Sequence, residues 1–155
     1  MSRRSRGEAW CWALALCGLV VAVDQGAKGA IVAGLERGQE VSLPLGFNLA
    51  RVANHGVAFG FLGGGGPVVV AITLAALAFV VGWFALDPLR PGLWLAVGLI
   101  AGGALGNLAD RVRTGAVTDF VDPPLWPAFN LADVAITAGA VILVLIALRP
   151  ERGRG

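Results

Sequence analysis

Carboxylates gather at one place in this chain, the stretch from Gly102 to Asp133, which lies between two strongly apolar segments. This stretch holds four of the ten acidic residues. They are Asp110, Asp119, Asp122 and Asp133, and they are accompanied by Asn107, Arg111 and Asn130. Two carboxylates in a partly desolvated site share one proton, so that one acts as a general base toward water and the other as a general acid. The cluster therefore admits aspartic-protease chemistry, alongside a structural role or a role in an ion path.

Local sequence makes Asp119 and Asp133 the candidates for such a pair. Asp119 lies in a short strand-like piece that can pack against helix ends, and Asp133 opens an apolar helix. Fifteen uncharged residues follow Asp133, so its charge lies at an apolar boundary, where an ionisable group is costly unless it is paired or used. Asp110 is next to Arg111, which favours a salt bridge, and Asp122 precedes two prolines, which favours a turn.

Other hydrolytic chemistries have few residues to draw on. His55 is the only histidine, so an all-histidine metal site is excluded and a serine–histidine triad would depend on it alone. A pair of Ser42 and Lys28 is conceivable, but Ser42 lies in an alternating segment where an outward polar residue is expected. The glycine run from Gly63 to Gly66 lacks the lysine and hydroxyl residue of a phosphate-binding loop. We expect no metal and no cofactor.

Composition indicates an integral membrane protein. Hydrophobic residues make up 57% of the chain and charged residues 14%, with a mean hydropathy of +0.77, far from a soluble domain. The chain has room for about four spans of about 20 residues. We place them at residues 10–32, 67–86, 93–108 and 131–148, in one domain over residues 1–155. The arginines lie mainly near the two chain ends rather than on one face, so we expect membrane lipids, and no nucleic acid, as partners.

Residues 36–63 and 110–129 are the expected outer loops. In the first, apolar residues alternate with polar or small ones from Val41 to Leu49, which predicts a half-buried strand in a small β-rich loop. Basic residues set the orientation. With both termini and the turn 87–92 in the cytoplasm, that side carries seven basic and three acidic residues, and the other side five and seven. The carboxylates then face the outer leaflet.

Glycines mark the third expected span. Gly98, Gly102 and Gly106 recur every four residues, so they share a helix face and predict that a neighbouring backbone packs closely against it. Asn107 and Arg111 are also four apart at the end of this helix, and so lie on one face.

Five pieces of the chain, in this order, resemble the lipoprotein signal peptidase family, also called signal peptidase II. They are Asp24-Gln25-x-x-Lys28, Asn54-x-Gly56-x-Ala58-Phe59, Gly102-Gly103-Ala104-Leu105-Gly106-Asn107-x-x-Asp110-Arg111, Gly115-x-Val117-x-Asp119-Phe120 and Phe129-Asn130-x-Ala132-Asp133. The resemblance covers about residues 20–140. The last three pieces together are highly specific, whereas the first two alone would be weak.

The resemblance implies an all-α membrane protein with four transmembrane helices, a small extracytoplasmic β-cradle in the first outer loop and a short helical element in the second. It also implies a multi-pass protein of the bacterial inner membrane, with both termini cytoplasmic and the active site at the outer leaflet; we expect a monomer. Family members cleave diacylglyceryl-modified prolipoproteins just before the lipidated cysteine, using two aspartates and a water. The catalytic pair then falls on Asp119 and Asp133.

Other family positions carry over as substrate-binding or supporting residues. They are Asp24, Lys28, Asn54, Gly56, Asn107, Asp110, Arg111 and Asn130. Phe59, Phe61, Trp126 and Phe129 suit an apolar rim at the membrane interface. One detail departs from the family pattern, because Gly26 and Ala27 are both small where at least one larger or hydroxyl residue is expected.

Two functions of other classes compete with an enzyme. A small channel or transporter would line an ion path with Asp24, Asp119 and Asp133, and it predicts charge near the middle of the spans. A structural assembly subunit would use the glycine face alone and leave the aspartates and asparagines without a role. The carboxylates are confined to helix ends on one side, which favours an interfacial enzyme.

Overall fold

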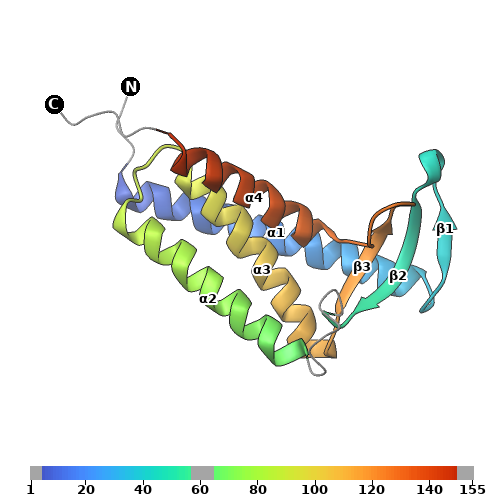
Figure 1. Cartoon of the computed structure of the whole chain (residues 1–155). Helices are drawn as coiled ribbons and strands as arrows, with labels where there is room; N and C mark the ends of the chain where they lie inside the picture. Colours follow the sequence, from blue (N-terminus) through green and yellow to red (C-terminus); the bar gives the residue numbers. More distant parts are fainter. Residues whose placement is uncertain (1–4, 57–64, 150–155) are drawn as a thin grey trace.

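The structure, a computed structural model, describes residues 5–56 and 65–149. Within them it is mostly helical, with four long helices and a three-stranded sheet. The helices are α1 (Arg6–Gly34), α2 (Gly65–Leu86), α3 (Leu93–Thr114) and α4 (Leu131–Ala147). The strands are β1 (Glu40–Ser42), β2 (Asn48–Asn54) and β3 (Val117–Asp122), with a 3-10 turn, η1 (Pro44–Gly46), between β1 and β2. The sheet lies at the end of the helical bundle where α1 and α3 finish and α4 begins (Figure 1).

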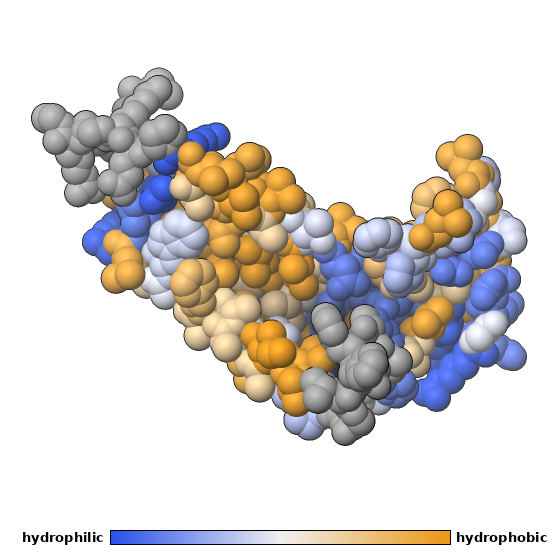
Figure 2. Space-filling view, viewed as in Figure 1, coloured by the Kyte–Doolittle hydropathy of each residue, from blue (hydrophilic) through white to orange (hydrophobic). Residues whose placement is uncertain are grey.

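Three of these helices, α1, α2 and α3, are long and apolar enough to cross a membrane. Helix α4 is also apolar, but its 17 residues rise only about 26 Å, against a hydrocarbon core of about 30 Å. Apolar residues cover the middle of the helices, whereas hydrophilic residues lie at the two ends of the molecule, around the sheet and near the chain termini (Figure 2). The molecule thus has an apolar middle between two more polar ends.

Capping residues set the helix ends. Helix α1 begins after Ser5, which forms a capping box with Glu8. Helix α3 ends at Gly115, whose backbone is left-handed (φ 77°) and whose N–H donates to the carbonyl of Arg111. Helix α3 therefore extends six residues beyond residue 108, the expected end of the third membrane span.

Helix α3 is the central helix and packs against α1, α4 and α2. A Cβ atom on Gly102 would lie 2.6 Å from Cβ of Val20 and 2.8 Å from the carbonyl oxygen of Cys17. One on Gly98 would lie 2.9 Å from the carbonyl oxygen of Ala13. The predicted close packing of the glycine face is therefore confirmed, and the neighbouring backbone is that of α1.

A second pair of glycines joins α3 to α4. Gly103 of α3 lies against the carbonyl of Ala132, and a Cβ on Gly139 of α4 would lie 2.9 Å from the carbonyl oxygen of Ala96. The backbone of α3 is thus in close contact with those of α1 and α4.

The sheet joins the two loops. Its order is β1-β2-β3 with both pairs antiparallel, and β3 comes from the second loop whereas β1 and β2 come from the first. Val52 pairs with Asp119 and Asn54 with Val117. This register brings Asn54 beside Asp119, although 65 positions separate them in the chain.

The alternating run in the first loop forms two strands rather than one. Pro44 has no N–H for the ladder and Leu45 has a left-handed backbone (φ 69°), so the chain turns there. Val41, Leu43 and Leu45 are exposed, so the expectation of a half-buried strand is wrong.

The expectation of a short helical element in the second loop is also wrong. Residues 123–130 form a turn and a bend, and Phe129 makes an isolated antiparallel bridge with Val121. The physical reason is the three prolines of this segment, which remove N–H donors that a helix interior needs.

We predict that Gly102→Ala destabilises the fold, whereas Gly82→Ala does not. The methyl on residue 102 meets α1, and overpacking of this kind costs about 1–3 kcal/mol. Gly82 of α2 has no atom within 4 Å of its ideal Cβ, so alanine there only removes the helix penalty of glycine, about 0.5–1 kcal/mol. Thermal unfolding of both purified variants in detergent compares them, and equal melting temperatures would contradict the tight contact.

Candidate active site

Asp119 is held within β3 with only 1% of its surface exposed. Its Oδ1 accepts a hydrogen bond from Asn130 Nδ2 at 2.7 Å, and its Oδ2 accepts one from Asn54 Nδ2 at 2.8 Å. Asn54 is oriented by the backbone N–H of Gly56, which donates to Asn54 Oδ1 at 2.8 Å. Gly56 has a left-handed backbone (φ 84°), which glycine adopts without strain. Both Asp119 oxygens are thus bonded to amides from separate parts of the chain.

Asp133 lies half-buried in the first turn of α4. Asn130 is the N-cap of this helix: its Oδ1 accepts from the Asp133 N–H at 3.0 Å, and its own N–H donates to Asp133 Oδ2 at 3.1 Å. Asn107 of α3 donates from Nδ2 to Asp133 Oδ1 at 2.8 Å. The start of α4 and the outer end of α3 together place this carboxylate.

Asn130 connects the two carboxylates. Its side-chain oxygen caps the helix turn of Asp133, while its side-chain nitrogen donates to Asp119 and, at 3.1 Å, to Asn107 Oδ1. Asn130 is fully buried. Because an amide is both donor and acceptor, one side chain can hold two acidic groups near each other without adding charge.

Burial raises the pKa of Asp119, because a charged carboxylate loses its hydration there. Hydrogen bonds from Asn54 and Asn130 and the charge of Lys28 act in the opposite direction, and the charge of Asp133 raises the pKa further. The net direction is upward. Asp119 therefore keeps its proton to a higher pH than an ordinary aspartate, which suits the acid of an acid–base pair.

A buried charge cluster of Asp24, Lys28 and Asp110 adjoins the pair. Lys28 Nζ lies 2.8 Å from Asp24 Oδ2 and 3.0 Å from Asp110 Oδ2, and it donates to Asn107 Oδ1 at 2.8 Å. All three charged side chains are buried. Removing one partner of a buried pair costs about 3–5 kcal/mol, so the cluster is a strong restraint on α1 and α3.

The carboxylates of this cluster also bind backbone next to the candidate pair. Asp24 Oδ1 accepts from the N–H of Ala132 at 3.0 Å, and Asp110 Oδ2 accepts from the N–H of Thr118 at 3.1 Å. These two residues directly precede Asp133 and Asp119 in the chain. The cluster therefore fixes the backbone beside each candidate carboxylate.

Gln25 is a site residue that the sequence analysis did not single out. Its Nε2 lies 2.9 Å from Asp110 Oδ1, 3.1 Å from the Gly106 carbonyl and 3.2 Å from Asp24 Oδ2. Arg113 donates to its Oε1 at 2.8 Å. The only signal in the sequence was its place directly after Asp24 in the first motif.

The expected salt bridge between Asp110 and Arg111 is not found. Asp110 pairs with Lys28 rather than with its neighbour Arg111, because consecutive helix residues point to different sides. Arg111 is half-buried, and its Nη1 lies 3.5 Å from the carbonyl of Asn107. Lys28 is buried among three partners while Ser42 is exposed on β1, so the structure gives the serine–lysine pair no support.

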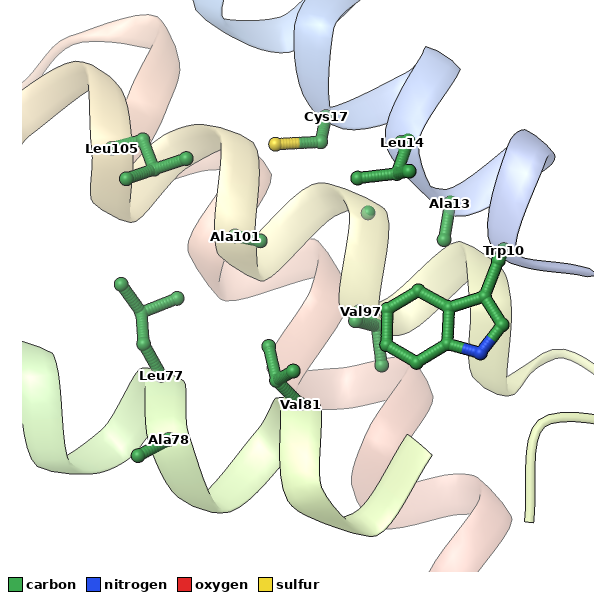
Figure 3. A pocket seen from close by; sticks show the side chains of 11 residues that line it. Trp10, Ala13, Leu14, Cys17, Leu77, Ala78, Val81, Val97, Ala101 and Leu105 are labelled. Atoms are coloured by element: carbon green, nitrogen blue, oxygen red, sulfur yellow. The ribbon is translucent and has the colours of Figure 1, made fainter. Parts of the chain in front are cut away.

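An apolar crevice of about 390 Å³ lies between α1, α2 and α3 (Figure 3). Its lining comes from all three helices and includes Trp10, Leu77 and Leu105, with no acidic or basic side chain among the lining residues. Cys17 is the one titratable residue among those that line it, so the crevice holds no carboxylate pair. Across residues 5–56 and 65–149, no three His, Cys, Asp or Glu side chains are grouped as ligands for a metal ion.

Two carboxylates held by amide side chains at one end of an apolar helical bundle suit the chemistry of an aspartic peptidase of the membrane. Comparisons with known proteins identify a family within that class. The family model described as signal peptidase (SPase) II matches residues 16–149. The chain belongs to the signal peptidase II family, and it is a protease.

Individual relatives show how far the similarity extends. The lipoprotein signal peptidase of Pelotomaculum thermopropionicum is 45% identical over 127 residues, which cover 81% of this chain and 84% of that protein. That of Moorella thermoacetica is 44% identical over 147 residues, covering 91% and 97%. A solved structure of a bacterial membrane enzyme matches with a TM-score of 0.81 and 31% identity, covering 88% of this chain and 92% of that chain.

We predict that the Asp119 carboxyl stays protonated above the ordinary aspartate pKa of about 3.9. Infrared difference spectra between wild type and Asp119→Asn, recorded as the pH is raised, follow the band of the protonated carboxyl. Since burial raises the folded-state pKa, the linked stabilisation is full at low pH and is lost as the pH rises through the raised value. Loss of the band at or below the ordinary value would contradict the burial argument.

Proposed function

We propose that this protein removes the signal peptide from diacylglyceryl-modified prolipoproteins by cutting the bond before the lipidated cysteine. Its relatives are lipoprotein signal peptidases, which indicates the substrate class. The observation that carries the proposal is Asn130, whose amide binds Asp119 and caps the turn that holds Asp133. The two carboxylates then lie on either side of one water molecule, as an acid and a base.

In this mechanism Asp119 is protonated before reaction and Asp133 is ionised. Asp133 removes a proton from water as the water oxygen attacks the carbonyl carbon of the scissile peptide, and Asp119 gives its proton to the carbonyl oxygen. The tetrahedral intermediate then collapses: Asp133 passes its proton to the departing amine, the C–N bond breaks, and Asp119 recovers a proton from a hydroxyl group. The pair ends in its starting state.

The surrounding side chains have supporting roles in the proposal. Asn54, Asn107 and Asn130 orient the carboxylates, and Arg111 at the outer end of α3 donates to the substrate backbone or to the developing oxyanion. Trp126 is 72% exposed and forms part of the apolar rim that meets the lipid-modified substrate. Phe129, a second expected rim residue, is half-buried and pairs with Val121, and the remaining two, Phe59 and Phe61, lie outside the described residues.

The chain crosses the bacterial inner membrane four times in this proposal, with α4 as the fourth span and both termini in the cytoplasm. Basic residues support this orientation. Arg6 donates to the Ala85 carbonyl at the end of α2, and Arg90 donates to the Ile146 carbonyl at the end of α4, so both lie at the end of the bundle away from the sheet. The site of the monomer then lies at the outer leaflet, where the substrate cysteine is anchored.

An ion path is the weaker alternative. It requires charged side chains through the depth of the spans, whereas Asp24, Asp119 and Asp133 lie together at one end of the bundle. Each of the three also accepts hydrogen bonds from the protein itself. The family and its relatives favour the enzyme.

We expect Asp119→Asn and Asp133→Asn each to lower the rate of prolipoprotein cleavage by at least about 10²-fold. Asparagine keeps the shape of the side chain but cannot transfer the proton. The measurement is cleavage of a diacylglyceryl-modified precursor by purified protein, with thermal unfolding to show that each variant is folded.

Asp122→Asn is the matched control, because Asp122 lies in the same strand as Asp119 but has no part in the proposed chemistry. It should cleave at close to the wild-type rate, and so should Ser42→Ala. A normal rate for Asp119→Asn would show that the pair is wrongly assigned, and loss of activity in Ser42→Ala would revive the serine–lysine alternative.

We also expect the enzyme to prefer a lipidated precursor peptide over the same peptide without lipid. Burial of only two or three methylenes of the acyl chains, at about 0.8 kcal/mol each, gives a preference of roughly 15- to 60-fold in kcat/KM. Mass spectrometry of the products locates the cut. Equal cleavage of both peptides would contradict lipid recognition, and cleavage of neither would contradict the proposed activity.

A further inference from the structure

Asn107 lies between the buried charge cluster and Asp133, and its amide has one possible orientation. Its Oδ1 accepts from Lys28 Nζ at 2.8 Å and from Asn130 Nδ2 at 3.1 Å, which uses both lone pairs of the oxygen. Its Nδ2 donates to Asp133 Oδ1 at 2.8 Å. Turning the amide over would place its N–H groups against an ammonium and another amide nitrogen.

Lys28 is the group that selects this orientation most strongly. An ammonium has three N–H donors and no acceptor, so Asn107 can present only its oxygen to it. Lys28 is 3% exposed, and its ion pairs and hydrogen bond are with Asp24, Asp110 and Asn107. Its hydrogen-bonded route to Asp133 therefore passes through the Asn107 amide, whereas its charge acts on Asp119 through space.

We propose that Lys28 is a positioning residue of the peptidase, which acts through Asn107 to hold the Asp133 carboxylate toward the attacking water. This inference rests on the proposed role of Asp133. Asp24 and Asp110 fix the ammonium, and the ammonium fixes the amide. The competing interpretation is that Lys28 only joins α1 to α3, and the two interpretations differ in how its substitution combines with that of Asn107.

The test variant is the double substitution Lys28→Met with Asp110→Asn. Lys28→Met alone would leave two buried carboxylates without a counter-charge and endanger folding. The double variant keeps the cluster at a net charge of −1, because two carboxylates and one ammonium are replaced by Asp24 alone. Asp24 still accepts from the Ala132 N–H and from Gln25 Nε2.

In otherwise wild-type protein, we expect the double variant to lower kcat on a lipidated precursor peptide roughly 10- to 100-fold. KM should change little, because Lys28 is buried and does not meet substrate. In an Asn107→Ala background, the same double substitution should lower kcat by a clearly smaller factor, since the bonded route from Lys28 to Asp133 is already absent and only the effects on Asp119 remain.

Gly98→Ala is the control for helix packing, because it strains the α1–α3 contact at the Ala13 carbonyl without touching the cluster. Its effects on kcat and melting temperature should be the same with and without Asn107. An equal loss of kcat from the double variant in both backgrounds would overturn the inference, as would a lower melting temperature with kcat unchanged. Normal cleavage by Asp133→Asn is a separate result, which would overturn the proposed catalytic pair instead.

Discussion

Desolvated charge is the constraint on which the rest of this structure depends. Three charged side chains, those of Asp24, Lys28 and Asp110, are buried between α1 and α3. Burial of an ion costs several kcal/mol unless the ion is paired and its hydrogen bonds are satisfied. The two carboxylates accept hydrogen bonds from backbone N–H groups at the start of α4 and in β3. These hydrogen bonds therefore fix the positions of α4 and β3 relative to the buried charges. Gly106 permits this, because any Cβ there would lie 2.6 Å from Asp24 Oδ2.

Neutral amides separate this charge cluster from the candidate catalytic carboxylates. Asn54, Asn107 and Asn130 all donate to Asp119 or Asp133, and none of them brings a charge. A direct salt bridge to Lys28 would favour the ionised form of either carboxylate strongly. Amide partners orient the two groups and lower the pKa of Asp119 only in part, so burial still keeps the net shift of that pKa upward. The asparagine amides thus position the two candidate carboxylates, and the ion pairs of Lys28 neutralise the separate charge cluster.

Sequence reasoning reached those features that depend on residue type and local spacing. Hydropathy located the long helices, and the period of four located the glycine face of α3. It did not predict which charged residues form ion pairs. Asp110 pairs with Lys28 because α1 and α3 cross there, and no local sequence pattern encodes that crossing. It also missed the turn at Leu45, where a single left-handed residue interrupts an otherwise regular alternation. Pairing of β2 with β3 across the two loops is equally a property of the assembled bundle.

The bond between Asp24 and the N–H of Ala132 spans 108 positions of the chain, and this distance has a consequence for biosynthesis. Helix α1 is synthesised first and α4 last. The Asp24 carboxylate is therefore made long before the Ala132 N–H that donates to it. Asn130 and Asp133 arrive with the same final segment. A nascent chain that ends before Asp133 lacks one of the two candidate carboxylates, so the candidate pair is present only late in synthesis.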